Sequence, residues 1–148
     1  MNSLRNLTFV AAGGAVGTSL RAAGFLAFSP AEGGFPWITL SENLLGAFLL
    51  GLLLTGALRH RPDSAFLRLF LGAGVLGSFT TFSAFAVDLV ALPMAGRPAA
   101  AAGYLALSVG GGLAAAALGL YLGRGRTGPR TPREGPPSTP PAPGSHST

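Results

Sequence analysis

Four long apolar stretches dominate the sequence, and they limit what the chain can fold into. They run from about Leu4 to Phe28, from Trp37 to Leu58, from Ala65 to Leu92 and from Pro98 to Leu122. Each reaches the length of about 20 mostly apolar residues that a helix needs to cross a bilayer. Charged residues make up only 10% of the chain, against about 25% in soluble domains. The sequence therefore predicts an all-α membrane protein, with four transmembrane helices in one unit over residues 1–123.

The segments outside these stretches have the composition of loops and of a tail. The linkers carry Gly, Pro, Asp and Arg, which favour turns. Residues 124–148 are rich in Pro, Gly, Ser and Thr, and a segment of this kind cannot bury a core. We expect it to be a disordered Pro/Arg-rich cytoplasmic tail. The first apolar stretch is longer than the core of a signal peptide, so we expect it to remain in the protein.

The distribution of arginine predicts how the chain is oriented, since the sequence has no lysine. One group lies at the chain ends and in the middle loop: Arg5, Arg59, Arg61, Arg68 and the tail arginines. The other side carries only Arg97 and Arg21. The positive-inside rule then places both termini in the cytoplasm. A net charge of +5 can also indicate a nucleic-acid partner, but juxtamembrane arginine explains it more simply, and we expect none.

Residues for enzyme chemistry are missing. The chain has no cysteine, and its two histidines, His60 and His146, fall in a loop and in the tail. No cluster of His, Asp and Glu has the spacing of metal ligands, and no nucleophile has an evident base. We therefore expect a membrane protein that is not an enzyme.

The centre of the third stretch, from Gly77 to Ser83, is a poor helix interior. Glycine costs conformational entropy there, and Ser and Thr compete for backbone hydrogen bonds. A break at this depth survives only where protein or water surrounds it, and its freed carbonyls can bind Na⁺. Phe82 and Phe85 follow on one helix face, with positive ring edges that can attract an anion. A Ser/Thr packing seam beside two core phenylalanines is the plainer alternative, but the combination favours a functional site.

Other polar residues in the spans are candidates because polar groups are costly in a membrane. Arg21 is either a snorkelling arginine, a structural arginine that holds a loop, or a basic group in the vestibule of an anion. The amide of Asn43 can join helices or donate to an anion. Glu42, about 100° around the helix, should face a different partner, as a vestibule charge or a coupling carboxylate. Tyr104 is either a satisfied core tyrosine or part of a polar track with Ser83.

Glycine recurs in all four spans, where small residues let helices approach closely. Packing is the expected role of most of these glycines, and almost the whole role in the fourth span at Gly110-Gly111-Gly112. Four helices are barely enough to enclose a polar pathway, so we expect an oligomer with the functional site at or near the subunit interface.

Three motifs resemble those of the bacterial fluoride channels of the CrcB/Fluc type. They are Gly13-Gly14-x-x-Gly17-x-x-x-Arg21, Thr39-Leu40-x-x-Asn43-x-x-Gly46 and Gly77-x-Phe79-Thr80-Thr81-Phe82-Ser83-x-Phe85. Their order and spacing fit the family, and the resemblance covers all four spans. It implies a dimer of oppositely oriented subunits in the bacterial cell membrane. Such a dimer exports fluoride passively and protects the cell from it.

The same resemblance implies roles for single residues. A structural Na⁺ at the dimer centre is held by the backbone carbonyls of Gly77 and Thr80. Arg21 matches the arginine of the family's first helix. The fluoride pore is then lined by Asn43, Phe82, Ser83, Phe85 and Tyr104.

The sequence departs from the family at two positions beside this pathway. Glu42 stands where the family usually has a small apolar residue, and Ala84 where it often has threonine. An acid beside an anion pathway repels fluoride unless it is protonated, paired or turned away. The missing hydroxyl at Ala84 shortens the polar track.

The partner and two alternative functions complete the expectations. Because the arginine bias favours one orientation, we expect an inverted partner, which is either the same chain or a paralogue. A small four-helix multidrug transporter is one alternative, although its coupling glutamate lies in the first helix, where this chain has no acid. A membrane scaffold without transport activity is the other.

Overall fold

The computed structural model describes residues 2–28 and 34–125, and these residues are helical apart from short connections. The elements in chain order are α1 (Asn2–Ala27), α2 (Trp37–Leu52), η1 (Leu53–Ala57), α3 (Leu58–His60), η2 (Phe66–Leu76), α4 (Gly77–Phe79), α5 (Phe82–Met94) and α6 (Pro98–Arg124). The predicted tail after Gly125 lies outside the described residues.

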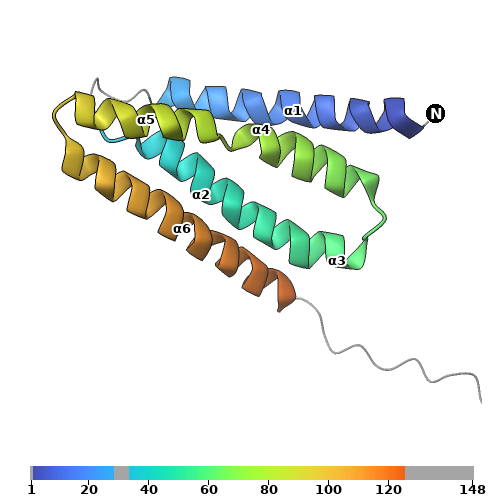
Figure 1. The fold of residues 1–148 in the computed structure, drawn as a ribbon. Coiled ribbons are helices and arrows are strands. Elements are labelled where there is room, and N and C mark those ends of the chain that lie inside the picture. Colours follow the sequence, from blue (N-terminus) through green and yellow to red (C-terminus); the bar gives the residue numbers. More distant parts are fainter. Residues whose placement is uncertain (1, 29–33, 126–148) are drawn as a thin grey trace, which may run out of the picture.

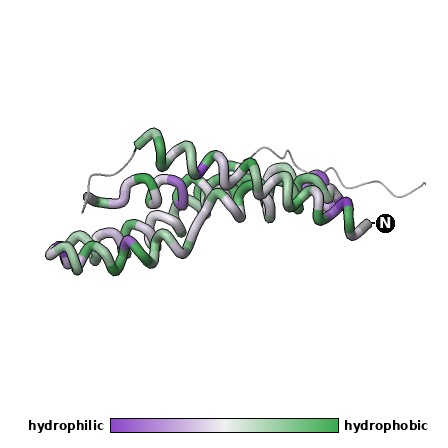
Figure 2. The backbone as a smooth tube through the Cα atoms, turned by 90° about the horizontal axis from the view of Figure 1, so that it is seen from above, coloured by the Kyte–Doolittle hydropathy of each residue, from purple (hydrophilic) through white to green (hydrophobic). Residues whose placement is uncertain are grey.

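The four predicted spans are confirmed, with ends that shift by a few residues. Helices long and apolar enough to cross a membrane cover Ser3–Ala27, Trp37–His60, Phe66–Met94 and Pro98–Arg124. Figure 2 shows long apolar stretches along these helices, with hydrophilic colour in short segments only. The protein is therefore a multi-pass membrane protein.

The junction of the third and fourth spans differs slightly from the prediction. Pro93 lies inside α5, which continues to Met94. The chain then turns at Gly96, whose φ of 75° lies in a region that glycine adopts without steric cost. Pro98 opens α6 at a position where its missing N–H would have had no helical partner.

The spans do not pack in chain order. The third span lies between α1 and α2, while α6 runs along α2 on the far side (Figure 1). The start of α1, the turn after α3 and the end of α6 lie toward the same end of the molecule. The arginine-rich segments of the described chain therefore gather at that end.

Glycine permits the closest contacts between the helices. A Cβ at Gly13 would overlap the Phe70 carbonyl, and one at Gly74 would lie 2.8 Å from the Cα of Gly13. These positions join α1 to η2. On the other side of the molecule, a Cβ at Gly51 would overlap the Ala116 carbonyl of α6.

The packing role expected for the glycines of the fourth span is only partly confirmed. A Cβ at Gly111 would meet Leu44, but Gly110 and Gly112 have open space within 4 Å. Gly119, which the sequence did not single out, makes the close contact instead, because a Cβ there would overlap the Phe48 carbonyl. Thr55 reinforces this seam by donating to the carbonyls of Gly51 and Leu120, each at 3.0 Å.

Candidate functional site

The third span is broken near its centre, as the sequence predicts. Thr80 has φ −82° and ψ 154°, and Thr81 has φ −148° and ψ 128°, so both residues are extended between α4 and α5. Thr81 is the N-cap of α5, and its hydroxyl accepts a hydrogen bond from the Ala84 N–H at 3.3 Å. The Thr80 hydroxyl donates to the Leu76 carbonyl at 3.0 Å and closes the end of the preceding helix.

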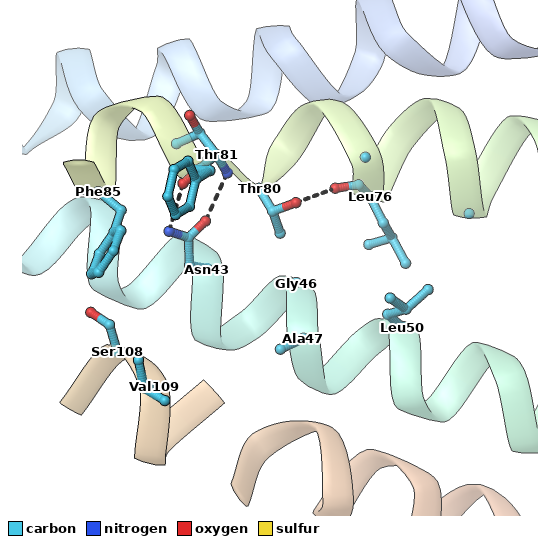
Figure 3. A pocket seen from close by; sticks show the side chains of 13 residues that line it. Asn43, Gly46, Ala47, Leu50, Leu76, Thr80, Thr81, Phe85, Ser108 and Val109 are labelled. Carbon is cyan, nitrogen blue, oxygen red and sulfur yellow. Dashed lines mark hydrogen bonds between the residues drawn. The ribbon is translucent and has the colours of Figure 1, made fainter. Parts of the chain in front are cut away.

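The side chain of Asn43, on α2, bridges this break. Its Oδ1 accepts from the Thr81 N–H at 2.8 Å, and its Nδ2 donates to the Thr81 carbonyl at 3.0 Å. Figure 3 shows the amide facing Thr81, with both bonds drawn. Nδ2 has two hydrogens, so one N–H remains after the bond to Thr81.

A pocket of about 500 Å³ opens beside the break, between α2, the third span and α6. It gathers five of the nine residues that the sequence and the resemblance single out, namely Asn43, Gly77, Thr80, Phe82 and Phe85. The wall nearest the break depends on Gly46, because a Cβ there would overlap the Thr80 methyl group.

Two carbonyls at the break suit a small cation. In a continuous helix, the Thr81 N–H would donate to the Gly77 carbonyl and the Ala84 N–H to the Thr80 carbonyl. Both N–H groups donate to side chains instead, as described above. Carbonyl oxygens released from a helix are ligands that Na⁺ uses in membrane proteins, so the chemistry of Gly77 and Thr80 fits such an ion.

The aromatic residues beside the break differ in exposure. Phe82 is 78% exposed, and its ring centroid lies 5.8 Å from that of Phe85. Phe85 is half-buried and packs on Tyr104, with 5.4 Å between the ring centroids. Tyr104 is fully buried and donates its hydroxyl to Asp88 Oδ2 at 3.3 Å.

Ser83 does not share a hydrogen bond with Tyr104. Its hydroxyl lies 2.9 Å from the Thr81 hydroxyl, next to the break. The polar groups on this side of the molecule therefore form two clusters. One joins Thr81 and Ser83, and the other joins Tyr104 to Asp88, with Ser108 and Thr39 beside it.

Glu42 faces away from the pocket. A Cβ at Gly24 of α1 would lie only 2.6 Å from Glu42 Oε1, so the carboxylate is directed at α1. Arg21, one turn before Gly24, attracts it electrostatically. Oε1 is buried and has no hydrogen-bond partner among the described residues. The prediction that Glu42 and Asn43 face different partners is confirmed.

Sequence reasoning missed two residues of this region. Thr81 was quoted only as part of a motif, yet it both caps α5 and binds Asn43. Ser108 lines the pocket, and its buried Oγ lies next to the Tyr104 hydroxyl. Its spacing of four residues after Tyr104 puts both hydroxyls on one helix face, and this signal was available in the sequence.

The fold and the pocket define a class: a multi-pass membrane protein whose broken helix brings carbonyl oxygens and aromatic rings together at mid-span. The family described as CrcB-like protein, Camphor Resistance (CrcB), matches residues 8–120. The chain belongs to this family, so the resemblance seen in the motifs is confirmed.

Curated relatives agree with the family. A protein of Agrobacterium fabrum named fluoride-specific ion channel FluC is 43% identical over 120 residues, which cover 80% of this chain and 96% of that protein. A protein of the same name from Deinococcus radiodurans is 48% identical over 120 residues, covering 78% and 92%. FluC 3 of Streptomyces avermitilis is 46% identical over 118 residues, covering 80% and 58%, and the same organism also has a FluC 2. These relatives are ion channels, so the prediction that the chain is not an enzyme is confirmed.

Proposed function

We propose that this chain is a subunit of a fluoride-selective ion channel that exports fluoride passively and lowers its concentration in the cytoplasm. The observation that carries this proposal is the pocket at the broken helix, where Asn43, Phe82 and Phe85 lie together. The names of the relatives agree with it.

The chemistry of the pocket suits a small anion without a full positive charge. The second N–H of the Asn43 amide is a hydrogen-bond donor at the pocket wall. The edges of Phe82 and Phe85 carry partial positive charge and can replace part of an anion's hydration shell. Because Glu42 faces α1, its carboxylate does not oppose an anion in the pocket. We place Ser83, which is exposed beside the break, and Tyr104, which packs on Phe85, in the polar track next to this pocket.

The channel works as a pair of oppositely oriented subunits in this proposal. One side of the break is uncovered in a single chain, since Phe82 is 78% exposed and Ser83 is exposed beside it. Irregular backbone and hydroxyl groups at membrane depth need protein or water around them. A second subunit against this face supplies that cover, and it brings a second pair of Gly77 and Thr80 carbonyls to the centre. A Na⁺ bound there neutralises the facing carbonyl dipoles and joins the two subunits.

The orientation of this subunit follows from its arginines. We place both termini in the cytoplasm of a bacterial cell, because the start of α1, which holds Arg5, and the turn after α3, next to Arg59 and Arg61, lie at the same end of the molecule. A chain with a fixed orientation needs a partner of opposite orientation. The two numbered relatives of Streptomyces avermitilis support a paralogue as that partner.

Efflux from liposomes tests the function. The purified channel, formed by the chain alone or with its inverted partner, should release fluoride and retain chloride, and Phe82→Ala should abolish most of the fluoride release. Phe66→Ala is the matched control, because Phe66 is also exposed, at 46%, but lies at the far end of the same span against Phe70. Chloride release equal to that of fluoride would contradict the proposal.

The same assay tests the partner. Efflux by the chain alone supports a homodimer, whereas efflux that appears only after co-expression with a paralogue supports a heterodimer. Proton-driven export of a cationic dye would instead favour a multidrug transporter.

A further inference from the structure

The break in the third span frees the carbonyls of Gly77 and Thr80 because the two N–H groups that would bind them are directed elsewhere. The Thr81 N–H would donate to Gly77, and the Ala84 N–H to Thr80, in a continuous α-helix. In this structure the first donates to Asn43 Oδ1 at 2.8 Å and the second to the Thr81 hydroxyl at 3.3 Å. Two side chains thus take the donors of the two carbonyls that suit a cation.

The conformation of Thr81 explains why one amide can bind it twice. In an extended residue, with φ −148° and ψ 128° here, the N–H and the C=O point to the same side. In a helix they point in opposite directions along the axis. The Asn43 amide can therefore satisfy both groups only when Thr81 is extended. It stabilises the broken conformation and not the continuous helix.

The Thr81 hydroxyl acts on the other side of the break. As the N-cap of α5 it satisfies the Ala84 N–H, one of the donors that a helix start leaves without an acceptor. Without this hydroxyl, the Ala84 N–H would lack an acceptor. Extension of α5 at its N-terminus would then be favoured, because it lets this N–H donate to the Thr80 carbonyl. The Ser83 hydroxyl at 2.9 Å holds the Thr81 hydroxyl in this place.

We propose that Asn43 and Thr81 are positioning residues of the cation site: they occupy the donors that would otherwise cap the carbonyls of Gly77 and Thr80. This inference rests on the proposed function, because the Na⁺ site is part of the proposed channel. It assigns Asn43 two tasks, one toward the backbone of the break and one toward the pocket. It also gives Thr81 a role of its own, as the residue that binds Asn43 and caps α5.

The test measures Na⁺ affinity without measuring transport. The melting temperature of the full-length protein is followed as Na⁺ replaces a large organic cation at constant ionic strength. Thr81→Val keeps the shape but loses the hydroxyl, and it should raise the half-saturating Na⁺ concentration by about tenfold or more. Thr81→Ser keeps the hydroxyl and should stay within about twofold of the wild type. Asn43→Asp keeps an acceptor but loses the donor to the Thr81 carbonyl, and it should also weaken Na⁺ binding.

Thr55→Val is the matched control, since it removes a hydroxyl that donates to two carbonyls between η1 and α6, away from the break. It should lower the melting temperature equally at every Na⁺ concentration and leave half-saturation unchanged. If Thr81→Val behaves in the same way, the inference is wrong.

Hydrogen exchange of the unmodified protein gives a second measurement that no folding defect can affect. Na⁺ should slow the exchange of the Thr81 and Ala84 amides, because a bound cation and the broken conformation stabilise each other. Equal exchange with and without Na⁺ would overturn the inference. A wild type that conducts fluoride but does not respond to Na⁺ overturns only this inference, whereas a Na⁺ response without fluoride efflux overturns only the proposed function.

Discussion

The amide of Asn43 holds both polar main-chain groups of Thr81, at 2.8 Å and 3.0 Å, and so ties α2 to the middle of the broken third span. Both partners are partly buried. The extended backbone at Thr81 therefore depends on how α2 is rotated about its axis, because that rotation directs the Asn43 side chain at the break.

Replacing Asn43 by alanine should lower both the stability of the protein and its fluoride efflux. The substitution leaves the Thr81 N–H without its acceptor at membrane depth, and an unsatisfied group of this kind costs about 1–3 kcal/mol. We expect a lower melting temperature and fluoride efflux reduced by about tenfold or more. Asn6→Ala is the control, because Asn6 lies near the free end of α1, far from the break. Wild-type stability and efflux in Asn43→Ala would show that the amide has no role at the break.

The two phenylalanines should differ in their effect on stability. Phe82 is 78% exposed in the subunit, so Phe82→Ala should leave the melting temperature of the dissociated subunit nearly unchanged. Phe85 packs on the buried Tyr104 ring, and Phe85→Ala should cost about 1–3 kcal/mol, less than the loss for a fully buried ring. Thermal unfolding in detergent measures the difference. A larger loss at Phe82 than at Phe85 would contradict this assignment.

Adding a methyl group at Gly46 should disturb the break. The new Cβ would overlap the Thr80 methyl group, and the close packing on either side leaves little room for relaxation. We expect Gly46→Ala to reduce both stability and efflux. Gly112→Ala makes the same chemical change in α6, where nothing lies within 4 Å. It should be neutral or stabilise by up to about 1 kcal/mol, because alanine favours a helix.

Neutralising Glu42 should have little effect on conduction. The carboxylate faces Gly24 and is attracted by Arg21 on α1, so Glu42→Gln removes no charge from the pocket. Fluoride efflux should stay within about twofold of the wild type. An increase by tenfold or more, which would correspond to about 1.4 kcal/mol of removed repulsion, would mean that the carboxylate does act on the pathway.

Much of the fold follows from the sequence, because membrane spans are set by length and hydropathy. The break was also predictable, since Gly77 and the Thr80-Thr81 pair weaken a helix wherever they occur. The π-helical segments η1 and η2 were not predicted. A π-turn differs from an α-turn by one residue in its hydrogen bonds, and apolar side chains give no signal for that change.

The site was harder to predict than the spans. The sequence left open whether Asn43 joins helices or donates to an anion, and both ends of its amide do join α2 to the main chain of Thr81. The partner of Tyr104 proved to be Asp88 and not Ser83. These pairings depend on how the helices rotate against each other across long separations in sequence, and hydropathy carries no information on that rotation.

The order in which the spans pack has a consequence for biosynthesis. The first span rests mainly on η2 and α4, and the second mainly on α6, while α1 and α2 meet only slightly. A nascent chain that has inserted its first two helices therefore lacks a packed helical hairpin. Each of these helices stays exposed to lipid until the helix that it packs against has been synthesised. Assembly of this subunit should be completed only when α6 has left the ribosome. A chain truncated before Pro98 should accordingly be recognised and degraded by membrane quality control.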